Sequence, residues 1–251
     1  VLVGPGVVVP AVESASCERS VSDRVPPRID PLVMKNGAVV EPNDEAYEMA
    51  DVIGCCGVET CVDDQTIYIP QTIGKMPQMN QKQTLQVLRE AKESWDGGSG
   101  LWPQMSITDR IAAIQNFVQQ LNSQRSNIIN LLMWEVGKNQ NDAAAEFDRT
   151  MNFIQALIAQ IQQNPSHWQT IGSVRAYVRR AAIGIILALG PYNYPLNETY
   201  ATLIPALLMG NIVIMKIPTI GGLSHLLTMD AFSKALPPGT IHFVSGGGRA
   251  T

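Results

Sequence analysis

The parallel-sheet signal of this chain lies in residues 183–248, which read IGIILALGPYNYPLNETYATLIPALLMGNIVIMKIPTIGGLSHLLTMDAFSKALPPGTIHFVSGGG. Apolar runs of strand length alternate here with segments of helical pattern. Strands are expected at Ile183–Leu189, Ile212–Ile217 and Thr240–Val244, the first two of the buried type, and helices at Asn197–Met209 and Gly222–Leu236. This alternation predicts an α/β fold with a parallel sheet and right-handed crossovers.

Ligands of such sheets bind at the carboxyl ends of the strands. Three short segments follow the predicted strands: Pro191–Tyr194, Lys216–Thr219 and Gly246–Arg249. We therefore expect the groups that carry chemistry in these segments.

Each of these segments allows two interpretations. The Asn193 amide can donate a hydrogen bond to an oxygen that gains negative charge, but Asn often satisfies the backbone of its own loop, and the residues alone favour that plainer role. Lys216 is placed to bond a ribose or phosphate, although lysines that reach to solvent are more common. Gly246–Gly248 would let backbone N–H groups approach a ligand, although glycine clusters often mark only a loop.

The first half of the chain is expected to cover the sheet. Residues 1–24 lack a strand or helix period and predict a disordered extension, and residues 25–163 predict strands and helices. One helix is expected to begin after Asn80, with Leu85, Leu88 and Trp95 near one face. Further helices are expected after Ser106, over 125–138 and over 142–162.

Composition excludes several classes of protein. Hydrophobic residues make up 45% of the chain, which allows a sizeable core. The net charge is −4 with scattered basic residues, so we expect no nucleic-acid partner. No apolar run reaches the ~18–20 residues of a membrane span, so we expect no membrane partner. The four cysteines, Cys17, Cys55, Cys56 and Cys61, lack the spacing and nearby histidines of a metal site, and they predict reduced thiols of a cytoplasmic protein.

Residues 183–251 closely resemble the aldehyde dehydrogenase superfamily. GPYNYPLNETYATLIPALLMGN at 190–211 is similar to the subgroup that oxidises glyceraldehyde 3-phosphate with NADP without adding phosphate, and LLMWEVGK at 131–138 and EFDRT at 146–150 agree. The resemblance implies a partial aldehyde-dehydrogenase fold. Its parallel Rossmann-like sheet would have helical cover, residues 181–251 would form a truncated NADP-binding core, and the carboxyl-terminal catalytic domain would be lacking.

In this family a cysteine thiolate attacks the aldehyde, hydride passes to the nicotinamide, and a glutamate-activated water hydrolyses the thioester. Asn193 matches the family's oxyanion donor. Pro191 and Tyr192 match the wall beside the nicotinamide half, although Tyr192 replaces the usual tryptophan. Lys216 matches the lysine that holds the adenosine ribose and its phosphate, and Gly248 matches a glycine beside that ribose.

Thr219 implies NADP as the cofactor. NAD-preferring relatives usually carry a glutamate at this position, and its carboxylate would repel a 2′-phosphate. A neutral hydroxyl removes that repulsion and can donate to the phosphate.

Two residues imply a small phosphorylated aldehyde as the substrate. Tyr194 stands where the subgroup places a tyrosine hydroxyl on the substrate phosphate, and Arg149 matches an arginine that clamps the same phosphate. The alternative for Arg149 is an exposed helix residue that pairs with Asp148 or Glu146.

Val174–Arg180, within an oligomerisation segment at 164–180, resembles the strand of the family's subunit interface and implies a homodimer or homotetramer. We expect the catalytic cysteine and glutamate beyond Thr251, so this polypeptide alone should be inactive. The parent would oxidise glyceraldehyde 3-phosphate to 3-phosphoglycerate. The alternatives are a broader aldehyde dehydrogenase and an inactive truncated product that binds nucleotide or forms oligomers.

Overall fold

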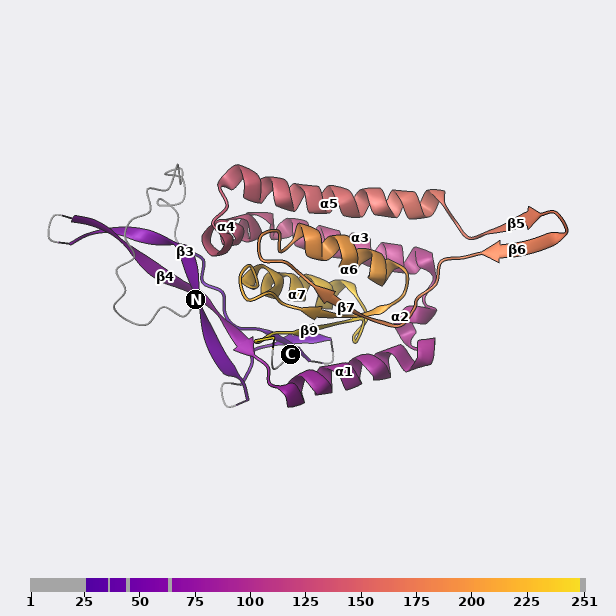
Figure 1. Cartoon of the computed structure of the whole chain (residues 1–251), viewed down its shortest axis with the longest axis horizontal. Coiled ribbons are helices and arrows are strands. Elements are labelled where there is room, and N and C mark those ends of the chain that lie inside the picture. The colour runs from indigo at the N-terminus through magenta and orange to yellow at the C-terminus, as the bar shows by residue number, and fades with distance from the viewer. Residues whose placement is uncertain (1–25, 36, 44–45, 63–64, 249–251) are drawn as a thin grey trace.

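The computed structural model describes residues 26–35, 37–43, 46–62 and 65–248 (Figure 1). The expected extension at 1–24 and residue Arg249 lie outside these ranges.

The centre of the fold is a three-stranded parallel sheet in the order β7-β8-β9. Its strands are β7 (Ile185–Leu189), β8 (Ile212–Lys216) and β9 (Ile241–Val244), and the crossover helices are α6 (Asn197–Leu208) and α7 (Leu223–Ala235). The expected alternation of strands and helices is confirmed, because every element lies within two residues of its predicted bounds. The strands end level with one another, since Leu189 pairs with Lys216 and Lys216 pairs with Val244.

Helices cover the sheet in layers (Figure 1). Helix α1 (Gln81–Trp95) lies below the sheet and contacts all three strands. Helices α6 and α7 lie on the other side, and above them lie α3 (Ile107–Ser123), α4 (Arg125–Val136) and α5 (Gln140–Gln163). The short helices η1 (Asp96–Gly98) and α2 (Leu101–Gln104) link α1 to α3.

The main core lies between these helical layers. Phe117 of α3 stacks on Phe232 of α7 with ring centroids 4.0 Å apart, and Tyr200 of α6 meets both rings edge-on. The apolar stripe of α3 is buried as its spacing predicts, at Ile111, Ile114, Phe117, Val118 and Leu121. This packing ties α6 and α7, and therefore the loops that precede them, to the helical cover.

Local capping signals begin two of the helices as expected. The Asn80 side chain accepts from the Gln83 amide at 3.0 Å while Gln83 reaches back to the Asn80 amide at 2.8 Å, which is a complete capping box. The Ser106 hydroxyl accepts from the Asp109 amide at 3.1 Å and begins α3.

Three antiparallel hairpins complete the structure. The first two pair β1 (Val33–Lys35) with β2 (Ala38–Val40) and the long strand β3 (Glu48–Val62) with β4 (Gln65–Gln78). The third pairs β5 (His167–Ile171) with β6 (Val174–Val178) and projects away from the helices (Figure 1). None of the helices in the described ranges has the length and apolarity that a membrane span requires.

The structure corrects one expectation about burial. Strand β7 is not buried on both faces, since Leu187 and Leu189 are 60% and 65% exposed. The reason is a hollow between β7 and α1, which leaves that face of the strand uncovered. Helix α1 packs through Val87 and Ala91, whereas Leu88 faces the hollow and is exposed.

Candidate functional site

Three loops meet at the carboxyl edge of the sheet. One loop follows each of β7, β8 and β9, because the three strands run parallel and end in register. The segments chosen from the sequence therefore lie at a common edge, where ligands of open α/β sheets bind.

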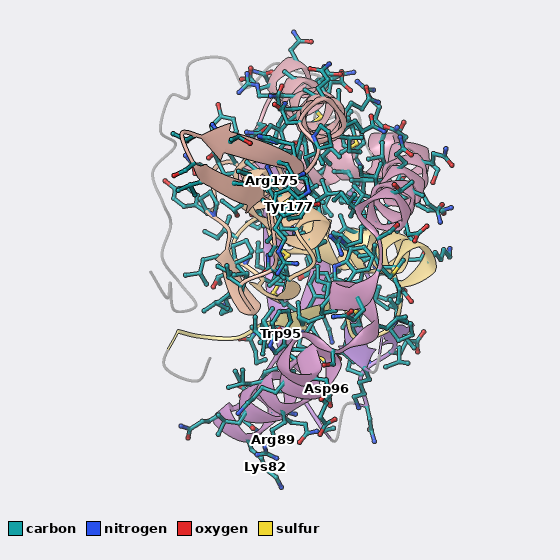
Figure 2. The ribbon with its side chains drawn as sticks, turned by 90° about the vertical axis from the view of Figure 1, so that its right-hand side faces the viewer. Lys82, Arg89, Trp95, Asp96, Arg175 and Tyr177 are labelled. Carbon is teal, nitrogen blue, oxygen red and sulfur yellow. The ribbon has the colours of Figure 1, made fainter. Side chains whose placement is uncertain are left out.

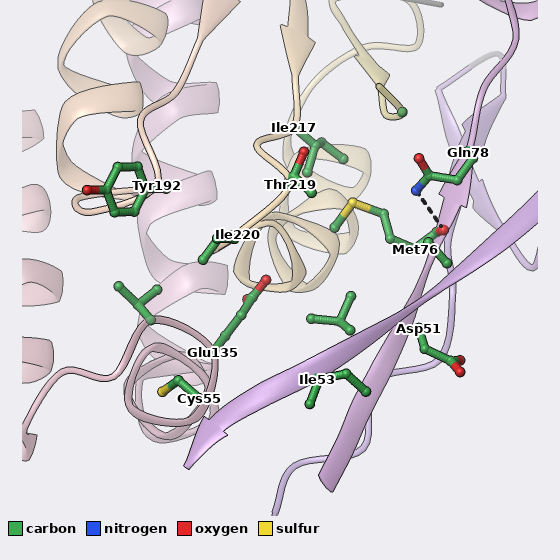
Figure 3. A pocket seen from close by; sticks show the side chains of 14 residues that line it. Asp51, Ile53, Cys55, Met76, Gln78, Glu135, Tyr192, Ile217, Thr219 and Ile220 are labelled. Atoms are coloured by element: carbon green, nitrogen blue, oxygen red, sulfur yellow. Dashed lines mark hydrogen bonds between the residues drawn. The ribbon is translucent and has the colours of Figure 1, made fainter. Parts of the chain in front are cut away.

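A pocket of about 460 Å³ opens between these loops, the β3–β4 hairpin and the end of α4. Each loop contributes to its lining, through Tyr192, Thr219 and Gly246. Figure 3 shows Thr219 and Ile220 on the loop after β8, with Glu135 of α4 beside them and Cys55 of β3 below. The structure thus brings together two of the predicted cofactor-binding residues, Tyr192 and Thr219.

Lys216 and Gly248 line a different hollow, of about 550 Å³, on the α1 side of the sheet. The Lys216 side chain is half-buried there, its ammonium donates to the Ile217 carbonyl at 2.9 Å, and burial lowers its pKa. Lys216 is therefore not a lysine extended freely into solvent. Of the six predicted cofactor and catalytic residues, four are therefore divided between two hollows, and Pro191 and Asn193 line neither of them.

Asn193 is exposed on the loop between β7 and α6. Within the part of the chain that the structure describes, its amide forms no hydrogen bond to the loop backbone, so the plainer role considered for it is not observed. The loop passes close to α6 at Gly190, where an added Cβ would lie 2.1 Å from the Thr199 hydroxyl.

Tyr194, the next residue of this loop, contacts a cation. The Lys138 ammonium lies 3.6 Å from the centroid of the Tyr194 ring, and Lys138 also pairs with the buried Glu146. The Glu146 carboxylate in turn accepts from the backbone amides of Leu196 and Asn197, at 3.0 and 3.2 Å.

A second buried carboxylate supports the loop after β8. Glu135 accepts from the Leu223 amide at the start of α7 and lines the pocket beside Thr219. Burial raises the pKa of Glu135 to about 7, and the backbone N–H groups of residues 221–224 oppose that shift.

Sequence reasoning overlooked Glu135, Lys138 and Glu146. A signal for the two glutamates was present, since Glu146 falls on the apolar stripe of α5 three residues after Ala143, and Glu135 falls four residues after Leu131 on α4. A charged residue at a buried position requires partners, because an unpaired buried charge is costly.

Arg149 lies exposed on α5 and is not brought to Tyr194 by any contact in the described ranges. The alternative pairing of Arg149 is not observed, because Asp148 binds Arg125 at 2.7 Å and Glu146 binds Lys138. The Cys55 thiol lines the pocket but donates to the Met133 and Trp134 carbonyls, at 3.6 and 3.2 Å, which does not suit a nucleophile.

Comparison with known proteins shows which family the sequence matches. Residues 63–251 match the aldehyde dehydrogenase family. The chain is 31% identical over 193 residues to the NADP-dependent glyceraldehyde-3-phosphate dehydrogenase of Streptococcus equinus, covering 72% of this chain and 40% of that protein. It is 28% identical over 148 residues to the N-succinylglutamate 5-semialdehyde dehydrogenase of Escherichia coli, covering 58% of this chain and 30% of that protein.

Solved structures agree on the fold. The NADP-dependent glyceraldehyde-3-phosphate dehydrogenase of Bacillus halodurans, complexed with NADP, superposes with a TM-score of 0.72 at 24% identity, over 88% of this chain and 44% of that one. Aldehyde dehydrogenase 21 of Physcomitrella patens, in complex with succinate, gives 0.73 at 20% identity, over 90% and 44%. The expected partial aldehyde-dehydrogenase fold is confirmed, and the chain spans about 40% of the curated relative with the higher identity. From the match over residues 63–251, the chain belongs to the aldehyde dehydrogenase family.

Proposed function

We propose that this chain is the cofactor-binding part of an NADP-dependent aldehyde dehydrogenase that oxidises glyceraldehyde 3-phosphate to 3-phosphoglycerate in the cytoplasm. The observation that carries the proposal is the pocket shared by Tyr192 and the neutral Thr219 at the carboxyl edge of the sheet. The similarity to the Streptococcus enzyme, which is named for NADP and for this aldehyde, supports it.

The chain offers two groups, each in its own hollow, that could bind parts of a phosphorylated ribose. Thr219 is exposed in its pocket, and its own side chain carries no carboxylate that would repel a phosphate. Lys216 supplies a cation at the end of β8, three residues earlier, and Gly248 leaves room beside β9. Pro191 and Tyr192 would form the wall along the nicotinamide half, and NADP, when bound, accepts hydride.

Asn193 would act on the substrate. Its unengaged amide can donate to the aldehyde oxygen as that oxygen gains negative charge, and removal of one such donor lowers kcat about 10²–10³-fold in other enzymes. Tyr194 and Arg149 would bind the substrate phosphate. We place the cysteine nucleophile and the glutamate base in the rest of the parent protein, because this chain covers 40% of the Streptococcus enzyme. The Cys55 thiol, which lines the pocket, is hydrogen-bonded to two carbonyls.

The β5–β6 hairpin would join subunits into a homodimer or homotetramer. Its apolar side chains are exposed, and Ile171 is 69% exposed. Arg175 lies 4.5 Å from the centroid of the Trp168 ring, and Tyr177 packs against the same ring at 5.0 Å, so side chains of the two strands contact each other. Figure 2 shows Arg175 and Tyr177 of this hairpin. Exposed apolar surface of this kind is typical of an interface.

Calorimetric titration with NADP and NAD tests the cofactor. We expect NADP to bind at least about 10-fold more tightly, a difference of ~1.4 kcal/mol. Lys216→Met should weaken the binding of NADP, whereas the control Lys92→Met, at an exposed position of α1, should leave that affinity unchanged. Equal affinities for the two cofactors, or no binding of either, would contradict the proposal.

Arg149→Ala in the parent protein tests the substrate. If the substrate is phosphorylated, KM for glyceraldehyde 3-phosphate should rise strongly in this variant. The control is Arg89→Ala, at another exposed helix position. An unchanged KM favours the broader aldehyde dehydrogenase. NADP binding in a parent without turnover would instead identify a nucleotide-binding or oligomer-forming product.

A further inference from the structure

Lys138 and Glu146 form a buried ion pair next to the loop that carries Asn193. Glu146 is 1% exposed, and one of its carboxylate oxygens receives a short hydrogen bond from the Lys138 ammonium. Lys138 is itself largely covered. Since burial of charge is costly without full pairing, the contacts made by the remaining atoms of this pair show what it holds in place.

The second carboxylate oxygen of Glu146 caps helix α6 from a distant part of the chain. It accepts from the amides of Leu196 and Asn197, 50 and 51 residues away in sequence. The N-cap residue of α6, Leu196, has no side-chain hydrogen bond of its own. A negative charge at a helix N-terminus is favourable, so Glu146 replaces the missing cap and fixes the end of the loop.

The Lys138 ammonium holds the middle of the same loop through the Tyr194 ring, 3.6 Å from its centroid. The loop is therefore held at Tyr194 by the cation and at Leu196 and Asn197 by the carboxylate. Its other end is fixed where β7 pairs with β8 at Leu189. Asn193 stands between these attachments.

We propose that Lys138 and Glu146 are positioning residues that fix the Pro191–Asn197 loop and thereby aim the Asn193 amide and the Tyr194 hydroxyl. The consequence for catalysis rests on the function proposed above, whereas the fixing of the loop does not. The competing explanation is that the pair only joins α5 to α6, the helices that pack together here.

Amide hydrogen exchange on the whole chain separates these explanations without a ligand. Glu146→Gln should speed exchange at Leu196 and Asn197 roughly 10-fold, because their acceptor loses its charge and its partner. Lys138→Met keeps the aliphatic stem and should loosen Tyr194 and its neighbours. Lys138→Arg should restore slow exchange, since a guanidinium can pair with the carboxylate and stack on the ring.

Asp148→Asn is the matched control, because Asp148 lies on α5 like Glu146 but forms an exposed pair with Arg125 of α4. It should leave exchange at 191–197 unchanged. Circular dichroism under the exchange conditions tests whether every variant is folded. Faster exchange spread evenly over α5 and α6, or unchanged exchange at 191–197 in folded Lys138→Met, would overturn the proposal.

In the parent enzyme, misplacement of Asn193 predicts a fall in kcat of about 10-fold for Lys138→Met, with little change in KM for NADP and recovery in Lys138→Arg. Failure of the wild-type chain to bind NADP would defeat the proposed function but not the exchange result. The two proposals can therefore fail separately.

Discussion

Glu135 and Leu223 are 88 residues apart, yet both carboxylate oxygens of Glu135 lie within hydrogen-bond distance of the Leu223 amide, at 3.1 and 3.3 Å. This contact seats the first turn of α7 against the end of α4. The loop that carries Thr219 runs directly into that turn, so Glu135 supports the cofactor side of the site as Glu146 supports the side of Asn193.

The burial of Glu135 predicts how stability depends on pH. Burial raises the pKa of Glu135 from 4.5 to about 7, so the folded chain holds a proton that the unfolded chain releases between these values. The stability contributed by that proton is complete below pH 4.5 and is lost as pH rises through 7. The loss amounts to about 3 kcal/mol.

Glu135→Gln should remove this loss. Urea unfolding from pH 4.5 to 8 measures the free energy of unfolding, which should change less with pH in the variant than in the wild type. Glu198→Gln, at an exposed position of α6, should keep the wild-type profile. Identical profiles for Glu135→Gln and the wild type would show that the carboxyl group is not protonated in the fold.

Thr219→Glu should reverse the cofactor preference. A carboxylate at this position repels a 2′-phosphate and can bind free ribose hydroxyls. The affinity for NADP should therefore fall at least about 10-fold, while the affinity for NAD is retained or improved. Thr219→Gln, of the same size without the charge, should weaken NADP far less. Calorimetry on the three proteins measures this, and an equal loss in both variants would point to size rather than charge.

Gly190→Ala should destabilise the junction between β7 and α6. The new Cβ would lie 2.1 Å from the buried Thr199 hydroxyl, and such overpacking costs about 1–3 kcal/mol. Adding Thr199→Ala removes the clashing atom and should recover part of the loss. Urea unfolding of the two single variants and the double variant gives the coupling, and additive effects would exclude this clash as the cause.

Ile171→Glu should reduce self-association if the β5–β6 hairpin joins subunits. A charge on its exposed apolar surface would be desolvated in an interface, which is costly. Sedimentation velocity should show a shift toward monomer, while Ile107→Glu, at an exposed position of α3, should not change the distribution. A monomeric wild type would refute the oligomer directly.

The order of elements from β7 to β9, and the start of α1, can be predicted from the sequence alone. The β7–α6–β8–α7–β9 alternation and the capping box at Asn80 depend on side-chain periodicity and on hydrogen bonds within one helical turn, which neighbouring residues supply. The placement of Thr219 and Lys216 after β8 follows from the same local pattern.

Packing between distant segments settled the remaining features. Thr219 and Lys216 are three residues apart, yet they line different hollows because other elements cover the two sides of the sheet. The open face of β7 depends on where α1 lies, and no pattern within Ile183–Leu189 encodes that. Glu135 and Glu146 meet amides 88 and 50 residues away, since the free energy of a buried carboxylate is set by whatever partners the folded helices bring to it.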